Sequence, residues 1–488
     1  MATKPLNICL VSSEFASLAK TGGLGDVSSA LSSYLHSAGH DVRVLIPRYS
    51  RIDALGLEID PVPALADMSV RLGNREVHFS IDRLTLESGL PVYLVRCPEF
   101  YGRDAIYTND DDEHLRFALL SRAALEMCQR FGFAPDIMSC HDWQTSLIPL
   151  YLKSIYSWDE LFSNTKSVLT IHNIGYQGQF GSWIMDHLSL NGAEHHLHQD
   201  DFKSGVINFL KTGVMYADLV TTVSPTYARE ILGEDYGMGL NDLLWQRVDS
   251  VVGILNGVDY GEWDPATDPL IPANYSPKDM SGKRVCKERL MQEMGLEIVP
   301  ERPLLGIVTR LAGQKGIELV DQVIPRILDC RDCAIVVLGS GEERYEHFFE
   351  WLSQRFPGRA AFYRGYNNDL AHWIEAGSDV FLMPSLYEPS GLNQMYSMKY
   401  GTVPVVRETG GLADSVDQID PATGDGTGVV FRHYDAPGFE WAVSTALNYY
   451  ANKDLWQKVI ANGMAKDFSW DEQGSRYVEL FDELRGAA

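Results

Sequence analysis

Three things are scarce in this sequence: long apolar runs, positive charge and paired cysteines. The 488 residues include 41 Lys and Arg against 66 Asp and Glu, so the formal net charge is −25. That balance argues against a protein that coats nucleic acid or anionic membrane, because either surface would repel it. No apolar run approaches the roughly 18 residues that a membrane-spanning helix needs, and we expect neither such a helix nor a signal peptide.

The cysteines do not suggest a disulfide framework or a metal site. The seven are odd in number and scattered, which is typical of a reduced, cytoplasmic protein. Cys330 and Cys333 form a CxxC without a second pair, so we interpret them as packing residues, with redox or metal use as the alternative. The polar clusters Asp110–Glu113 and His195–His198 lack metal-ligand spacing, and we expect no bound metal.

The residues that are abundant predict a two-domain α/β protein. An apolar fraction of 45% is enough for sizeable cores. Short apolar runs such as Leu6–Ser13 and Asp41–Ile46 alternate with helical patterns, which indicates parallel sheets. The same alternation restarts after Asn256, so we place one domain at residues 1–254 and the other at 255–469. The amphipathic helix 470–488 could pack on either half, and we assign it to the first domain.

Parallel sheets bind ligands at the carboxyl ends of their strands, so the loops after predicted strands are candidate sites. Lys20 and the glycines that follow it precede a helix, where backbone N–H groups favour an anion. The alternative is a tight turn with a solvated lysine. Arg310 and Lys315 share a glycine-containing loop after the strand Leu304–Thr309. Together they could neutralise a diphosphate, or they could be two solvated charges.

Three further positions follow predicted strands. Glu388 stands just before Gly391 and Leu392 at a helix start, where its carboxylate suits sugar hydroxyls or simply caps the helix. His141 and His172 each end a strand. A lone histidine is more often structural, but this placement gives the functional interpretation equal weight.

Seven motifs in order now carry a resemblance to a known family. They are KTGGLGDV, HDWQT, TIHNIGYQGQF, TVSPTYARE, GILNGVD, TRLAGQKG and EPSGLNQMYSMKYG. Together they cover nearly the whole chain and resemble bacterial glycogen synthase and plant starch synthase, of glycosyltransferase family five. The resemblance implies the GT-B fold, in which two Rossmann-like domains face a deep cleft. It also implies transfer of glucose from ADP-glucose to the non-reducing end of an α-1,4-glucan, with retention of configuration and without a metal.

The resemblance also implies roles for individual residues. The catalytic set is Lys20, His172, Arg310, Lys315 and Glu388. The set that binds the donor and its sugar is Gly23, Asp26, Asn256, Tyr366, Ser390, Gly391, Leu392 and Asn393. The acceptor side comprises Tyr101, Asp142 and Trp143. Arg310 and Lys315 would hold the diphosphate and stabilise the leaving ADP, Lys20 would reach the phosphates as the cleft closes, and Glu388 would hold the donor glucose.

Two positions depart from the family pattern, and two alternatives stay open. The family commonly has Cys where this chain has Ser390, and some members have Thr where it has Asn393, which bears on donor affinity. Retention without an evident nucleophile implies attack on the face that ADP leaves, with the departing phosphate taking the acceptor's proton. The alternatives are a transferase of the same fold using UDP-glucose and a small acceptor, and a glucan-binding protein that has lost catalysis. The sequence does not predict an oligomeric state.

Overall fold

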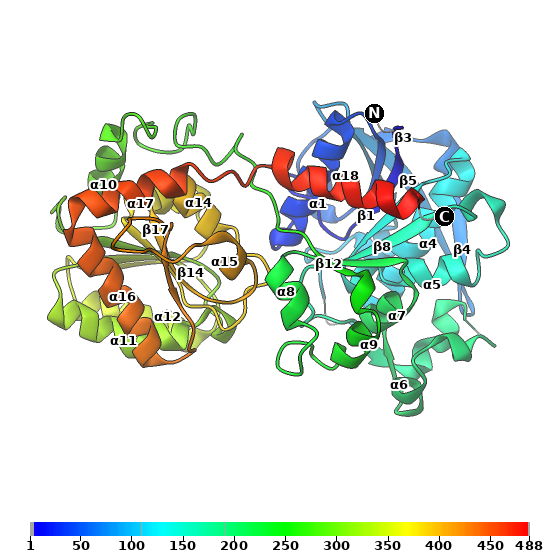
Figure 1. Cartoon of the computed structure of the whole chain (residues 1–488). Helices are drawn as coiled ribbons and strands as arrows, with labels where there is room; N and C mark the ends of the chain where they lie inside the picture. Colours follow the sequence, from blue (N-terminus) through cyan, green and yellow to red (C-terminus); the bar gives the residue numbers. More distant parts are fainter. Residues whose placement is uncertain (1–3, 109, 191, 487–488) are drawn as a thin grey trace. The chain divides into compact units, whose positions relative to one another are not determined.

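The computed structural model describes residues 4–108, 110–190 and 192–486. The chain forms two compact units, one made of residues up to Gly257 together with those from Trp470 onward, the other of Val258–Ser469 (Figure 1). The sequence placed the first division three residues earlier, after residue 254. Among the described helices, none combines the length and the apolar character needed to cross a membrane.

The N-terminal unit is built on a ten-stranded sheet. Its strands are β1 (Asn7–Val11), β2 (Asp41–Pro47), β3 (Asp60–Pro61), β4 (Met68–Leu72), β5 (Arg75–Thr85), β6 (Pro91–Arg96), β7 (Ile137–His141), β8 (Lys166–Ile171), β11 (Leu219–Thr222) and β12 (Val251–Gly253). In the order β12-β11-β8-β7-β1-β2-β6 every neighbouring pair is parallel. The antiparallel strands β3, β4 and β5 extend this sheet beyond β6, an edge that the sequence analysis did not predict.

Helices and a small two-stranded sheet complete this unit. The helices are α1 (Gly23–Ser37), α2 (Ser50–Asp53), α3 (Pro98–Tyr101), α4 (Glu113–Phe131), α5 (Leu147–Lys153), α6 (Gln199–Lys203), α7 (Phe209–Tyr216), α8 (Pro225–Glu230), α9 (Asn241–Gln246) and α18 (Trp470–Gly486). The small sheet pairs β9 (Gln179–Gly181) with β10 (Val206–Asn208).

The last helix packs on the first one. Figure 1 shows α18 alongside α1. A Cβ atom at Gly474 would lie 2.3 Å from the ring of Tyr34, so glycine is what lets the two helices approach. The predicted helix extended to residue 488, and its last two positions lie outside the described residues.

The C-terminal unit is a wholly parallel sheet covered on both faces. Its strands, in the order β15-β14-β13-β16-β17-β18, are β13 (Leu304–Val308), β14 (Ala334–Gly339), β15 (Ala360–Arg364), β16 (Val380–Met383), β17 (Val403–Arg407) and β18 (Val429–Phe431). Its helices are α10 (Ser281–Glu293), α11 (Ile317–Cys330), α12 (Glu343–Arg355), α13 (Asn368–Gly377), α14 (Asn393–Lys399), α15 (Gly410–Ser415), α16 (Ala436–Ala451) and α17 (Lys453–Met464).

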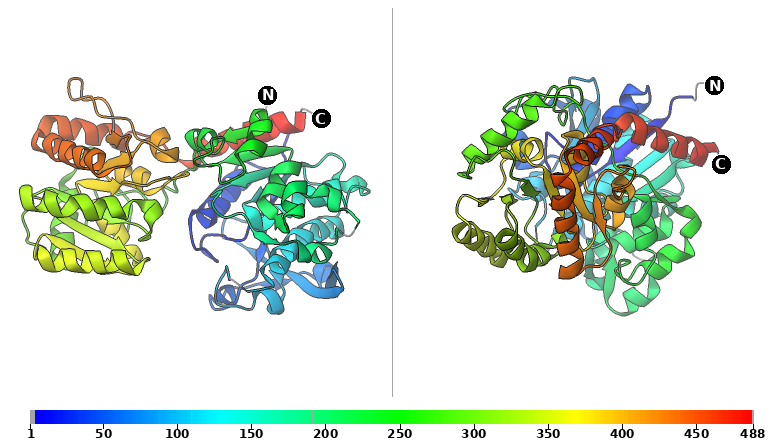
Figure 2. Two further views of the ribbon diagram at one scale, coloured as in Figure 1. Left: turned by 90° about the horizontal axis from the view of Figure 1, so that it is seen from below. Right: turned by 60° about the vertical axis from the view of Figure 1, so that its left-hand side comes forward.

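Alternate residues of one strand enter different cores. Leu304 packs in the cluster that includes Ile374 of α13, whereas Leu305 packs in the cluster that includes Val323 of α11. Helices therefore lie on both sides of this sheet, as Figure 2 shows. A sheet buried on both faces explains why its strands read as continuous apolar runs in the sequence.

Each parallel sheet has a point where the strand order reverses. In the N-terminal unit β1 lies between β2 and β7, and in the C-terminal unit β13 lies between β14 and β16. Ligands of such sheets bind at the carboxyl ends of the strands next to this point. The predicted architecture of two parallel α/β domains is confirmed, and it draws attention to the loops after β1, β7, β8, β13 and β16.

Candidate active site at the carboxyl ends of the strands

A buried carboxylate, Glu14, organises the loop after β1, although the sequence analysis did not single it out. Its Oε2 accepts hydrogen bonds from the backbone N–H groups of Thr21 at 2.6 Å and Gly22 at 3.2 Å. Its Oε1 accepts from the Thr21 hydroxyl at 2.8 Å and from the Tyr107 hydroxyl at 2.6 Å. Four donors on one carboxylate fix the conformation of the loop that carries the predicted phosphate contacts.

Lys20 and Asp26 meet on the outer side of this loop. Lys20 Nζ donates to Asp26 Oδ1 at 2.7 Å, and both side chains are partly exposed. A Cβ at Gly25 would lie 2.7 Å from Lys20 Cβ, so the third glycine of KTGGLG makes room for the lysine stem. A Cβ at Gly23 would meet nothing within 4 Å, which leaves open space beside the start of α1.

The loops after β7 and β8 form a buried histidine pair. His141 Nδ1 and His172 Nε2 are 2.9 Å apart, and Ser139 Oγ lies 3.2 Å from His141 Nε2. Burial lowers the pKa of His141 to about 3 and lowers that of His172 well below its ordinary value. Both rings are therefore neutral near pH 7, with one ring nitrogen donating to the other. His172 is positioned to hydrogen-bond a ligand but not to supply a positive charge.

Asp142 lies between these loops in an unusual conformation. Its φ of 55° and ψ of −171° fall in a region that non-glycine residues rarely occupy. Its Oδ1 accepts from the backbone N–H groups of His172 at 2.7 Å and Asn173 at 3.3 Å. Burial raises the pKa of Asp142 to about 7, the two backbone donors oppose the rise, and the charge of Glu14 adds to it. A strained, half-titrated carboxyl is a mark of a functional site.

The structure gives the other two predicted acceptor-side residues packing roles. Tyr101 is fully buried, and its hydroxyl donates to the Arg116 carbonyl at 2.6 Å. Trp143 is 9% exposed and packs against Phe117 at a ring distance of 4.9 Å. A Cβ at Gly178 would lie 2.3 Å from the Trp143 ring. No side-chain surface of Tyr101 is open to a glucan, so we correct its predicted role to core packing. The side chain of Trp143 exposes only a small surface to a ligand.

The polar clusters judged unsuited to metal have protein partners. Within Asp110–Glu113, Asp110 and Asp112 pair with Arg103, and Glu113 pairs with Arg116. Within His195–His198, the imidazole of His198 caps α6. Over the described residues, no group of three or more His, Cys, Asp or Glu side chains is arranged to hold a metal ion.

The CxxC residues differ in exposure. Cys330 is exposed at the end of α11, whereas Cys333 is buried just before β14. Burial raises the pKa of the Cys333 thiol to about 11, so that side chain stays protonated and unreactive at neutral pH.

In the C-terminal unit, the loops after β13 and β16 meet in an ion pair. Lys315 Nζ donates to Glu388 Oε2 at 2.6 Å, and Ser385 Oγ donates to the same oxygen at 3.0 Å. Only 18% of the Lys315 side chain and 7% of the Glu388 side chain are exposed. The sequence analysis named both residues for separate roles, and the structure brings them into direct contact.

Three glycines allow the loops around this ion pair to touch. A Cβ at Gly316, whose φ is 72°, would lie 1.9 Å from the Pro384 carbonyl oxygen. A Cβ at Gly410 would lie 2.0 Å from the carbonyl oxygen of Glu388, and one at Gly411 would lie 2.0 Å from that of Ser390. The loop after β17 thus packs directly on the segment that carries Glu388, and any side chain at these positions would displace it.

Helix α14 starts from a segment that is tied to its surroundings by side-chain amides. Asn393 Nδ2 donates to the Val308 carbonyl at 2.8 Å, which joins the start of α14 to the end of β13. Gln394 Nε2 donates to the Ser390 carbonyl at 3.2 Å and to the Gly391 carbonyl at 3.0 Å. Ser390 Oγ makes only a long contact, 3.3 Å, with the Gly391 carbonyl. Leu392 is the residue before the helix and is half-buried.

The remaining predicted donor-site residues are available to a ligand. Arg310 is exposed, and within the described part of the chain its guanidinium has no ion-pair partner. Tyr366 is 73% exposed, and its hydroxyl donates to Asn368 Oδ1 at 2.8 Å. Asn256, in the N-terminal unit, is buried, and its Oδ1 finds no donor among the described residues. A buried amide oxygen without a partner is suited to accept from a ligand hydroxyl.

Both clusters occupy the position that their topology favours, but they offer different chemistry. The loop after β13 supplies two cations, one exposed and one paired with a carboxylate, which is what binding a diphosphate ester requires. The loops after β7 and β8 supply neutral rings and backbone groups, which suit hydroxyl-bearing ligands, whereas the loop after β1 carries the Glu14 carboxylate and the Lys20–Asp26 ion pair.

Two family models match the chain, one within each unit. Residues 7–246 match the family described as the starch synthase catalytic domain, and residues 292–463 match glycosyl transferases group 1. Glycogen synthase 1 of Geobacter sulfurreducens is 44% identical over 483 residues, which cover 98% of this chain and 96% of that protein. Glycogen synthase of Koribacter versatilis is 44% identical over 487 residues, covering 98% of each.

Solved structures show the same relationship. The catalytic domain of starch synthase IV from Arabidopsis thaliana, bound to ADP and acarbose, matches with a TM-score of 0.89 and 33% identity, over 99% of this chain and all of that one (100%). Sucrose-phosphate synthase from Thermosynechococcus elongatus matches with a TM-score of 0.61 at 16% identity, which shows a shared fold alone.

Proposed function

Because this chain belongs to the glycogen synthase and starch synthase family, and is therefore a glucosyltransferase that lengthens a glucan, we propose that its donor is ADP-glucose and its acceptor an α-1,4-glucan. The observation that carries the proposal is the ion pair of Lys315 and Glu388 at 2.6 Å, in loops that end the central strands β13 and β16. Arg310, from the same loop as Lys315, adds an exposed guanidinium. This places two cations and one carboxylate in the unit proposed to bind the donor.

Lys315 and Arg310 are proposed to bind the diphosphate and to stabilise the charge that develops as ADP leaves. A chain with a net charge of −25 repels anions at long range, so the attraction has to be local. The exposed Lys20 is proposed to add a third positive charge to the donor phosphates. Before a donor binds, Asp26 and the loop that Glu14 fixes hold the Lys20 side chain in place. Gly23 would contribute a backbone N–H group to the same phosphates.

Glu388 is proposed to hold the donor glucose. In the structure its Oε2 already has two donors, Lys315 Nζ and Ser385 Oγ. When a diphosphate competes for Lys315, the carboxylate becomes free to accept from sugar hydroxyls and to stabilise positive charge on the sugar ring. The pair therefore couples phosphate binding to sugar binding in a single contact.

The remaining predicted contacts are proposed to orient the sugar, the base and the acceptor. Asn256 and the neutral His172 would accept from or donate to glucose hydroxyls, and Tyr366 would stack on the adenine. Ser390, Gly391, Leu392 and Asn393 would line the distal phosphate and the sugar. Asp142 is proposed to face the acceptor side.

We propose that the transfer retains the configuration of the glucose. The acceptor hydroxyl attacks the face that ADP leaves, its proton passes to the departing phosphate oxygen, and the bond from the sugar to ADP breaks as the new glycosidic bond forms. His141 and His172 are neutral, so neither contributes a charge to this step. The protein supplies positioning and charge stabilisation, and it excludes water that would hydrolyse the donor.

We further propose that the reaction needs no metal and takes place in the cytoplasm. Two cations at the diphosphate site perform the charge neutralisation that a divalent ion provides elsewhere. All seven cysteines are unpaired, which suits a reducing compartment.

The test is incorporation of labelled glucose into glycogen from ADP-glucose and from UDP-glucose, each with and without excess EDTA. We expect ADP-glucose to be the better donor, EDTA to leave its rate unchanged, and NMR of the product to show new α-1,4 linkages. A higher rate with UDP-glucose would overturn the donor assignment. Glycogen binding without transfer from either donor would identify a glucan-binding protein that has lost catalysis, and loss of activity in EDTA with rescue by magnesium would overturn metal independence.

A further inference from the structure

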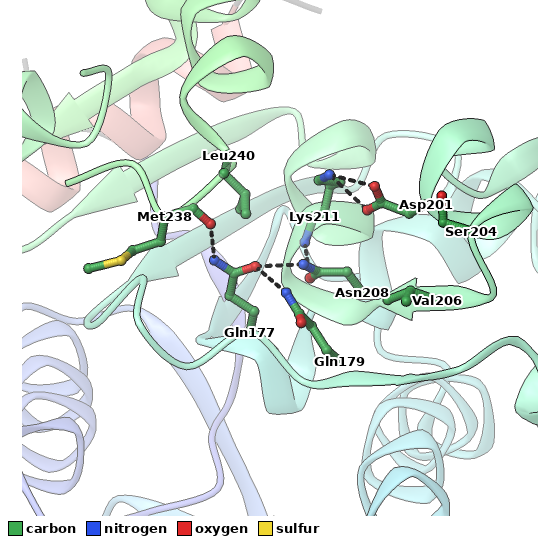
Figure 3. A pocket seen from close by; sticks show the side chains of 10 residues that line it. Gln177, Gln179, Asp201, Ser204, Val206, Asn208, Lys211, Met238 and Leu240 are labelled. Carbon is green, nitrogen blue, oxygen red and sulfur yellow. Dashed lines mark hydrogen bonds and ion pairs between the residues drawn. The ribbon is translucent and has the colours of Figure 1, made fainter. Parts of the chain in front are cut away.

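A polar cavity of about 270 Å³ in the N-terminal unit lies outside both strand-end clusters. It is formed by separate segments: the chain leading into β9, the strand β10, helix α6, the first turn of α7 and the loop before α9. Figure 3 shows side chains that line it, among them Gln177, Gln179, Asp201, Asn208, Lys211 and Met238.

Gln177 holds three of these segments together and has no hydrogen-bonding capacity left. Its Nε2 donates to the carbonyls of Ile174 at 3.1 Å and Met238 at 2.9 Å. Its Oε1 accepts from Asn208 Nδ2 at 2.6 Å and from Gln179 Nε2 at 3.1 Å. Two donated and two accepted bonds are all that an amide can make, so Gln177 fixes the cavity wall before any ligand arrives.

The charges in the cavity cancel. Lys211 Nζ lies 3.0 Å from Asp201 Oδ1 and 2.7 Å from Asp201 Oδ2, and only 11% of the lysine side chain is exposed. A lysine ammonium has three protons, so one stays available after both contacts. Because the pair is neutral overall, a charged ligand would have to be desolvated without a net opposite charge, which disfavours it.

What remains suits a neutral ligand with several hydroxyl groups. Gln179 uses its Nε2 on Gln177, and in the described part of the chain its Oε1 has no donor. The third Lys211 proton and the Asp201 oxygens can donate to and accept from hydroxyls, while Val206, Met238 and Leu240 offer apolar contact. A sugar ring presents this mixture of hydroxyl edge and C–H face.

We propose that this cavity binds one sugar residue of the glucan acceptor, away from the residue that reacts. The inference rests on the proposed function, since a polymeric acceptor has residues beyond the reacting end that need a place on the protein. The loop that starts at His172 after β8 leads within five positions to Gln177, and Tyr176 between them is 59% exposed, a ring on which a sugar can stack.

Two independent variants test the site. Gln179→Ala removes the free amide oxygen at an exposed position, together with the hydrogen bond from its Nε2 to Gln177 Oε1, and thermal unfolding checks that the fold survives the loss of this bond. The double variant Asp201→Asn with Lys211→Met removes both charges together and leaves no buried charge unpaired. Gln246→Ala, in the exposed part of α9, is the matched control. The measurements are KM for maltotriose, maltoheptaose and glycogen at saturating ADP-glucose, and retardation in native gels that contain glycogen.

Both pocket variants are expected to raise KM for maltoheptaose and glycogen about tenfold, as the loss of one or two hydrogen bonds predicts, and to weaken gel retardation. KM for maltotriose and for ADP-glucose should stay within about twofold, because those ligands are bound at the reacting end. Gel retardation needs no donor, so it reports on this site even if ADP-glucose proves to be the wrong donor.

Three results would overturn the proposal. The first is an unchanged KM for long acceptors in Gln179→Ala, a variant that does not depend on survival of the ion pair. The second is an equal rise for maltotriose and glycogen, which would place the effect at the reacting end. The third is competition by free glucose with no dependence on chain length, which would identify a monosaccharide site instead of an acceptor subsite.

Discussion

The two strand-end clusters occupy equivalent positions in their sheets but handle charge in opposite ways. In the N-terminal unit the buried groups that follow β7 and β8 are uncharged or half-titrated: the histidine pair is neutral, and the pKa of Asp142 is raised to about 7. In the C-terminal unit, Lys315 and Glu388 form an ion pair at 2.6 Å that is mostly buried. The same topology thus provides one cluster with neutral rings and a half-titrated carboxyl and one cluster built on an ion pair.

The comparison teaches that strand topology locates a site without deciding its chemistry. Both sheets reverse their strand order at a central strand, and that alone directs attention to the following loops. What differs is the kind of donor that each carboxylate binds. Glu14 and Asp142 bind mostly backbone N–H and hydroxyl groups, whereas Glu388 binds an ammonium. Variants that alter charge should therefore affect catalysis most in the C-terminal unit.

The largest effect is expected from Lys315→Ala. Removal of a cation that stabilises a leaving group typically costs about 3–4 kcal/mol of transition-state stabilisation, so kcat should fall by roughly 10²- to 10³-fold. Lys315→Arg should restore little, because a planar guanidinium cannot replace a compact ammonium against Glu388. Initial rates with labelled ADP-glucose measure kcat, and gel retardation measures binding to glycogen. We expect the variant to bind glycogen as the wild type does.

Two controls separate catalysis from folding in that experiment. Lys278→Ala changes an exposed lysine of the same unit and should leave kcat unchanged. Lys315→Ala also leaves Glu388 without its cation, so thermal unfolding must be followed, and Glu388→Gln in the same chain should recover stability without recovering rate. A near-normal kcat in Lys315→Ala would remove the basis for contrasting the two clusters.

The second prediction concerns the pH dependence of stability through Asp142. The folded-state pKa of about 7 lies above the unfolded value of about 3.9, so the native state binds the proton more tightly. The protonated carboxyl therefore stabilises the folded state. This contribution is complete below about pH 4 and is lost as pH rises through 7. At pH 8 the free energy of unfolding of Asp142→Asn should therefore exceed that of the wild type by about 2 kcal/mol, which is half of the value that the full pKa shift gives. At low pH the two free energies should be similar.

Thermal unfolding of both proteins between pH 4.5 and 8.5 measures this difference. The amide oxygen of Asn can still accept from His172 N–H and Asn173 N–H, so the loop should keep its shape. Asp200→Asn is the control, since that carboxylate is 88% exposed and should not alter the pH dependence. A stability difference between the two proteins that does not change from pH 5 to 8 would mean that Asp142 stays ionised throughout this range.

A smaller effect is expected from Glu14→Gln. The amide keeps one oxygen for the backbone N–H groups, but its NH₂ group would face the hydroxyls of Thr21 and Tyr107, which now donate to Glu14. Loss of about one net hydrogen bond, roughly 1 kcal/mol, should lower kcat/KM for ADP-glucose about fivefold through the Lys20 loop. Glu160→Gln, at an exposed residue of the short 3₁₀ helix Glu160–Phe162, is the matched control, and equal losses in both variants would argue against a role for Glu14.

The sequence predicted the parallel sheets, and it placed the candidate residues in loops that do follow strands, because continuous apolar strands followed by glycine-rich loops are a local pattern. It predicted neither the antiparallel strands β3–β5 nor the Glu14 contacts. The strand β5 mixes charged and apolar residues, which hides its alternation. The two residues between β4 and β5, Gly73 and Asn74, are a hairpin turn signal that was available in the sequence. Glu14 does follow a strand directly, and that signal was available, but its partner Tyr107 is 93 residues away along the chain.

Burial was the property that sequence could not provide. Trp143 belongs to the HDWQT motif, and the resemblance placed Tyr101 beside it on the acceptor side, yet contacts from Arg116, Phe117 and Gly178 enclose both side chains. In the C-terminal unit, the sequence named Lys315 and Glu388, but their mutual contact depends on Gly316 and Gly410, whose loops come from different strands. Contacts between loops are set by tertiary packing, and a single sequence records only the residues that permit them.

The smallest effect is expected at Ser390, where the family commonly has cysteine. The Ser390 hydroxyl makes only a 3.3 Å contact with the adjacent Gly391 carbonyl, and the close approach of Gly411 involves the Ser390 backbone, not its side chain. Ser390→Cys should therefore change KM for ADP-glucose and kcat by less than about threefold, since a weak, strained hydrogen bond contributes well under 1 kcal/mol. Ser390→Ala, measured beside it, tests whether the hydroxyl reaches the donor: if alanine raises KM tenfold while cysteine does not, a polar atom at this position contacts the phosphate, and Ser390 joins Lys315 in the charge-stabilising cluster.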